Sequence, residues 1–163
     1  MNTELDRLAA TLGLAAPESR ELALTFGLAC AKRIEHLLEE PEALECLKVL
    51  ENYVAGSAST ESLIHASETA SHLANRHRGS KSIDGCGHAA VSASYGVAKA
   101  VSGKAVEAAQ YCAYAAVYAA GGYAAVAERE AFDSEFSCQL ELLRSLVSAR
   151  NNHPNRNPAP SGA

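Results

Sequence analysis

Apolar residues recur along the first half of this chain at the three- to four-residue spacing of α-helices, and no stretch shows the alternation typical of a strand. A helix from about Pro17 to Glu40 carries apolar residues on two sides, which predicts a central position. Pro41 begins the next helix, and Gly56 ends it as a C-terminal cap. In chain order, the pattern predicts helices over residues 3–12, 17–40, 41–55 and 60–78. In the helix over residues 41–55, Leu44 is one of the predicted core residues. The short links between them favour antiparallel packing.

The second half of the chain is built from smaller side chains. After the turn-rich segment GSKSIDGCG come two alanine-rich helices, which separate at residues 102–103. The second of these contains QYCAYAAVYAAGGYAAVAE, residues 110–128, whose alanines would let neighbouring backbones approach closely. Its glycine pair, residues 121–122, predicts a break or a kink rather than a straight helix.

Large apolar residues return in a last helix, expected from about Tyr123 to Ala149. The following residues, 150–163, are rich in Asn and Pro and are predicted to form a disordered tail. The fold class is therefore all-α: a single-domain antiparallel bundle of about six to seven helices over residues 1–149, with alanine-rich helices at its centre. A length of 163 residues, 48% of them hydrophobic, suits one such domain.

Charge and hydropathy narrow the classes of partner. The net charge of −5 disfavours nucleic acid, because backbone binding needs clustered Lys and Arg. The start of the chain is too polar for a signal peptide, which favours a cytoplasmic protein. The uncharged run over residues 111–127 is at the lower limit for a membrane span, and alanine, glycine and tyrosine insert weakly, so no membrane role is expected.

The five cysteines are scattered, without a C-x-x-C pair, so they form neither a disulfide framework nor a zinc ribbon. Four of them fall in predicted helices, where a free thiol behaves as a small buried hydrophobe. The fifth, Cys86, lies in the segment DGCGH, two residues before His88, at a predicted helix start that would favour a thiolate. No third orienting group accompanies this pair, so a capped loop is the favoured interpretation and no catalytic residue is assigned.

One helix face presents His65, Glu68 and His72 at positions i, i+3 and i+7, a spacing that permits a shared ion. The three residues lie away from the apolar stripe that begins at Leu63, which places them on the surface. A metal site buried inside a helical bundle would need carboxylates that point inward from several helices, and the sequence does not provide them. We therefore expect no metal or other cofactor here and interpret the face as a solvated or partner-facing surface, with Arg76 as a further candidate for partner binding.

A second stripe consists of Tyr111, Tyr114 and Tyr118 on the alanine-rich helix. Aromatic residues at this spacing pack in a core in most helices, and each buried hydroxyl then needs a hydrogen-bond partner. Tyrosine is also favoured at binding surfaces, because it offers a large contact area at little entropic cost. Both interpretations remain open from the sequence.

The chain resembles a group of alanine-rich bacterial proteins of unknown function that includes planctomycete paralogues. The resemblance rests on ACAKRIEHLL, residues 29–38, and on a final Leu-Leu-Arg at residues 142–144. It is also similar to an immunity-protein family of bacterial polymorphic toxin systems, in which Gly-His-Ala opens an alanine-rich helix, as Gly87-His88-Ala89 does here. Ser94 stands where that family has a second histidine.

The resemblance implies a small helical cytoplasmic protein that neutralises a cognate toxin by binding it, without enzymatic activity. Two alternatives from other classes stay open. The alanine-rich faces suit a self-associating helical scaffold, a homo-oligomer. The histidine face or the pair Cys86 and His88 would instead suit a metal- or thiol-dependent enzyme.

Overall fold

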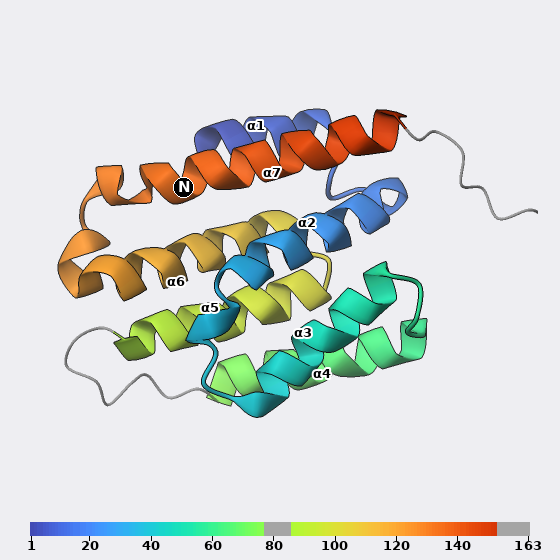
Figure 1. Cartoon of the computed structure of the whole chain (residues 1–163), viewed down its shortest axis with the longest axis horizontal. Coiled ribbons are helices and arrows are strands. Elements are labelled where there is room, and N and C mark those ends of the chain that lie inside the picture. Colours follow the sequence, from blue (N-terminus) through green and yellow to red (C-terminus); the bar gives the residue numbers. More distant parts are fainter. Residues whose placement is uncertain (77–85, 153–163) are drawn as a thin grey trace, which may run out of the picture.

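The computed structural model describes residues 1–76 and 86–152, and Figure 1 shows its ribbon. This part of the chain forms α-helices and short 3₁₀ helices, with no strand, which confirms the predicted all-α helical bundle. The α-helices are α1 (Thr3–Thr11), α2 (Arg20–Arg33), α3 (Pro41–Val54), α4 (Thr60–Arg76), α5 (Cys86–Val101), α6 (Ala105–Ala125) and α7 (Asp133–Asn152). The 3₁₀ helices are η1 (Pro17–Ser19), η2 (Glu35–Leu37) and η3 (Arg129–Phe132).

The helices run roughly along the long axis of the molecule, with α1 and α7 together at one edge and the α3–α4 hairpin at the other (Figure 1). Between these edges lie α2, α5 and α6, which all contact one another. The Asn2 side chain joins α1 to α7: its oxygen accepts a hydrogen bond from the Leu5 amide, and its nitrogen donates to the Phe136 carbonyl at 3.0 Å. The first helix is thereby held on the last.

The central helix α2 is buried on two sides, as its sequence predicts, with Leu24, Phe26 and Cys30 all at most 1% exposed. The expected length was wrong, because α2 ends at Arg33 instead of about Glu40. The next residue departs from helical geometry, and η2 leads the chain into an extended stretch. Proline disfavours the helical conformation for the residue before it, and Pro41 accordingly begins α3 after an extended Glu40.

Small residues set the spacing at the centre of the bundle. A Cβ added to Gly96 of α5 would lie 2.8 Å from the Cys112 sulfur of α6, and one added to Gly27 of α2 would lie 3.1 Å from the Ala100 Cα atom. The first distance is shorter than Cβ contacts in proteins and the second is tighter than most of them, so these glycines let the helices pack closely. Gly103, with a φ of +77°, makes the turn that returns α6 antiparallel to α5.

The predicted break at the glycine pair is confirmed, because Gly122 has a φ of 64° and a ψ of −153° inside α6. Only glycine adopts this conformation readily. The expected start of the last helix was wrong: α7 begins at Asp133, since an extended Glu128 and then η3 separate it from α6. It continues to Asn152, past the predicted end. The loop prediction for residues 79–85 and the tail prediction beyond residue 152 lie outside the described residues.

Three of the four helical cysteines, Cys30, Cys46 and Cys112, are buried and Cys138 is half-buried, which agrees with their prediction as small apolar residues. Leu44 differs from its predicted core position and is 39% exposed on α3. Within the described residues, no helix combines the length and apolar character that a bilayer crossing requires.

Candidate functional site

The outer face of α4 carries the first set of predicted site residues. His65, Glu68, His72 and Arg76 are all exposed on it. They point outward because the opposite side of the helix is the buried stripe Leu63, Ala66, Ala70 and Ala74. Beside His65 lies Ile64, which is 54% exposed, an unusual position for a large aliphatic side chain. The face therefore combines an apolar side chain with imidazoles and both signs of charge.

In the sequence, the spacing of His65, Glu68 and His72 allowed all three side chains to bind one metal ion. Among the described residues, no group of three or more His, Cys, Asp or Glu side chains is arranged to hold a metal ion. These three residues share a helix face without converging on one point. Their chemistry suits contact with a partner surface.

The tyrosine stripe of α6 is half-buried, and each of its members packs on another aromatic ring. Tyr111 stacks on Tyr95 of α5, with ring centroids 5.1 Å apart. Tyr114 meets Phe132 of η3 edge to face, also at 5.1 Å. The structure thus gives these tyrosines packing partners inside the chain and leaves part of each ring accessible.

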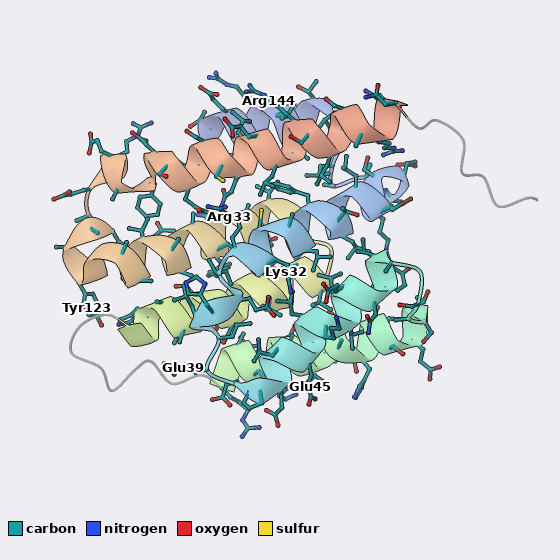
Figure 2. All side chains as sticks on the ribbon, viewed as in Figure 1. Lys32, Arg33, Glu39, Glu45, Tyr123 and Arg144 are labelled. Atoms are coloured by element: carbon teal, nitrogen blue, oxygen red, sulfur yellow. The ribbon has the colours of Figure 1, made fainter. Side chains whose placement is uncertain are left out.

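At the far end of the stripe, Tyr118 stacks on the His88 ring of α5 at a centroid distance of 5.4 Å. Tyr123 follows the α6 kink and meets the same imidazole edge to face at 4.6 Å. The Tyr123 ring is 51% exposed and lies at the end of the bundle, as Figure 2 shows. From the sequence, His88 was a candidate base for Cys86 and part of the Gly-His-Ala motif; the Cys86 side chain lies outside the described residues. In the structure the imidazole contacts tyrosines.

A buried polar network joins α2 to α7. The Arg33 guanidinium donates to Glu135 through Nε (3.1 Å to Oε1) and Nη2 (2.8 Å to Oε2), and Figure 2 shows Arg33 between the two helices. The Gln139 amide nitrogen donates to the Ala109 carbonyl at 2.7 Å and, more weakly, to Glu135 at 3.4 Å. The hydrogen bonds that Arg33 donates to Glu135 raise the pKa of Arg33. Such a bidentate pair fixes the relative position of the helices.

Buried thiols lie around this network. Burial raises the pKa of Cys30, and the negative charge of Glu135 adds to the effect. Burial likewise raises the pKa of Cys112 well above its ordinary value. A thiol is nucleophilic only as the thiolate, so these two cysteines act as packing groups. One sequence signal pointed to this network: the charged Arg33 lies on the same helix face as apolar residues of α2. Nothing in the sequence identified Glu135 as its partner.

Comparison with protein-family models, with curated proteins and with solved structures finds no match to this chain.

Proposed function

We propose that this chain is a non-catalytic binding protein of the immunity type, which neutralises a toxin by covering part of its surface. The contact surface is centred on the outer face of α4. The observation that carries the proposal is the exposed Ile64 among exposed polar side chains. Stable interfaces have this anatomy, with an apolar anchor near the centre and a polar rim.

The charge of the neighbouring surface defines the kind of partner. The corner between α2 and α3 carries four exposed carboxylates, Glu39, Glu40, Glu42 and Glu45. Figure 2 shows Glu39 and Glu45 at the edge of the molecule formed by the α3–α4 hairpin. An acidic surface on the same α3–α4 hairpin as the apolar anchor accelerates and orients the approach of a basic protein. The proposed partner is therefore a protein toxin with a basic surface, and a standard interface would cover about 800 Å² of each protein.

The test is co-expression with the product of a neighbouring toxin-like gene. The chain should restore growth, and Ile64→Asp should abolish the rescue and the complex because it places a charge at the anchor. Tyr123→Asp is the matched control: it adds the same charge to an exposed large side chain at a remote position, and rescue should persist. Neither rescue nor a complex with the unaltered chain would refute the immunity proposal. Equal rescue by both variants would refute the assignment to α4.

Self-association is a second candidate, supported by the far end of α6. Its exposed residues there are small or aromatic and uncharged: Ala119, Ala120, Gly121, Tyr123 and Ala124. Light scattering at high concentration should then show a dimer that Tyr123→Asp dissociates and Ile64→Asp leaves intact. A monomer at every concentration would exclude this candidate.

A further inference from the structure

A hollow of about 130 Å³ lies where α4, α5 and the start of α6 meet. This volume corresponds to roughly four water molecules, far below the pockets of drug-sized ligands. Two alanines form part of its wall. Its six polar lining residues are Ser71, Asn75, Tyr95, Lys99, Ser102 and Lys104. A ligand of this hollow would be small and polar.

The wall of the hollow is rich in hydrogen-bond donors. Tyr95 and Ser102 already use their hydroxyl protons on Asn75 and on the Ala98 carbonyl, which leaves four side chains with donors, two of them ammonium groups. None of the lining residues is an aspartate or a glutamate. In a chain with a net charge of −5, such a local surplus of donors favours an anion.

Internal hydrogen bonds hold this wall in place. The Tyr95 hydroxyl donates to Asn75 Oδ1 at 3.2 Å, which leaves the amide nitrogen as the donor end of that side chain. The Tyr95 ring is itself stacked on Tyr111. The Ser102 hydroxyl donates to the Ala98 carbonyl at 2.7 Å. Because these side chains are already oriented, a ligand would lose little free energy in ordering them.

The two lysines of the hollow differ in whether a carboxylate pairs with them. Lys99 pairs with Glu107, with 2.5 Å between Nζ and Oε2, so its charge is largely compensated. Lys104 is exposed and forms no ion pair with any residue of the described ranges. The charge of Lys104 also helps to lower the pKa of Glu107, so it is partly balanced, and the positive charge that remains at the hollow comes mainly from Lys104.

We propose that the hollow binds a small tetrahedral oxyanion of the phosphate class, either free or as a phosphate monoester. Donors from α4, from α5 and from Lys104 before α6 surround the hollow on several sides, which suits oxygens that point in different directions. This site stands independently of the protein-binding face on α4. Lys104 supplies the main charge, and Ser71 and Asn75 supply neutral hydrogen bonds.

The experiment titrates inorganic phosphate into the ¹⁵N-labelled full chain at constant ionic strength, with NaCl as the balancing salt. We expect saturable shifts confined to amides around Ser71, Asn75 and residues 99–107. Lys104→Ala should weaken binding about tenfold or more, as expected for the loss of one charged hydrogen bond. Lys48→Ala removes an exposed lysine elsewhere, on α3, and should change the affinity less than twofold. Lys104 is exposed, so its variant should remain folded, which circular dichroism checks.

Shifts that rise linearly without saturation, or equal losses in the two lysine variants, would overturn the proposal. Acetate, titrated in the same way, tests the geometry, and acetate affinity equal to that of phosphate would overturn the tetrahedral assignment. Phosphoserine distinguishes the two sources of phosphate. Tighter binding of phosphoserine assigns the site to an esterified group, and tighter binding of inorganic phosphate assigns it to the free ion.

Discussion

Replacing Arg33 by alanine would leave the Glu135 carboxylate in the interface between α2 and α7 without its charged partner. The Glu135 side chain is 9% exposed, so little water can replace the guanidinium. The only other side-chain donor to it among the described residues is the Gln139 amide nitrogen, at 3.4 Å. We therefore expect Arg33→Ala to destabilise the fold through an uncompensated buried charge.

The magnitude follows from the exposure of the two partners. Breaking a fully buried ion pair costs roughly 3–5 kcal/mol, whereas an exposed pair contributes about 0–1 kcal/mol. The Arg33 side chain is 38% exposed, so solvent screens part of its attraction to Glu135. An intermediate cost of about 2 kcal/mol is expected for Arg33→Ala. Glu135→Gln should cost less, about 1 kcal/mol, because the remaining guanidinium can turn toward solvent.

Urea unfolding followed by circular dichroism measures these differences. A loss of about 2 kcal/mol corresponds to a fall in the melting temperature of roughly 4–8 °C for a domain of this size. The control Lys48→Ala breaks the exposed pair with Glu51 and should stay within about 0.5 kcal/mol of the unaltered protein. A larger loss for Glu135→Gln than for Arg33→Ala would refute this reasoning.

Three further predictions concern packing, thiols and charge. Gly96→Ala should destabilise the fold by about 1–3 kcal/mol, since the new Cβ would lie 2.8 Å from the Cys112 sulfur, and adding Cys112→Ala should recover part of that loss in the same assay. A variant whose only cysteines are Cys30 and Cys112 should react with a thiol reagent no faster than it unfolds, because burial raises the pKa of both thiols; rapid labelling in native buffer would contradict this. The hydrogen bond from Lys99 lowers the pKa of Glu107, so Lys99→Met should return that pKa toward its ordinary value in an NMR titration, and an unchanged pKa would count against the pair. Its stabilising effect is present above the ordinary glutamate pKa and is lost as the pH falls through the lowered pKa of the folded state.

Much of the fold could be predicted because the signals are local. Proline at position 41 and glycines at positions 56 and 103 mark helix boundaries through backbone geometry alone, and apolar spacing identifies the helices between them. The early end of α2 could not be predicted in this way. Apolar periodicity continues through η2, because Ile34 and Leu38, which flank this 3₁₀ turn, are still buried in the core. Periodicity alone does not separate the two kinds of helix.

The candidate site could be predicted only where it lies on one helix. His65, Glu68 and His72 share a face of α4 by spacing, and the exposure of that face followed from the apolar stripe opposite to it. Contacts between distant segments were not accessible. The pairs of His88 with Tyr118 and of Arg33 with Glu135 depend on how α2, α5, α6 and α7 are arranged, and no pattern within one helix contains that information.

The alanine-rich centre limits where chemistry can occur in this fold. The buried residues of α5 are nearly all without functional groups: Ala89, Ala90, Ala93, Ser94, Val97, Ala98, Ala100 and Val101, with one serine hydroxyl among them. Such a centre holds the outer helices in fixed positions, and burial raises the pKa of its thiol Cys112 well above the ordinary value, so the proposed binding function uses the periphery. A rigid support lowers the entropic cost of binding at an outer face. Gly96→Ala, which disturbs the centre, should therefore lower the melting temperature without changing the partner affinity of the folded protein. Ile64→Asp should lower the partner affinity and leave the melting temperature unchanged. An equal effect of both variants on affinity would show that the binding surface is not confined to α4.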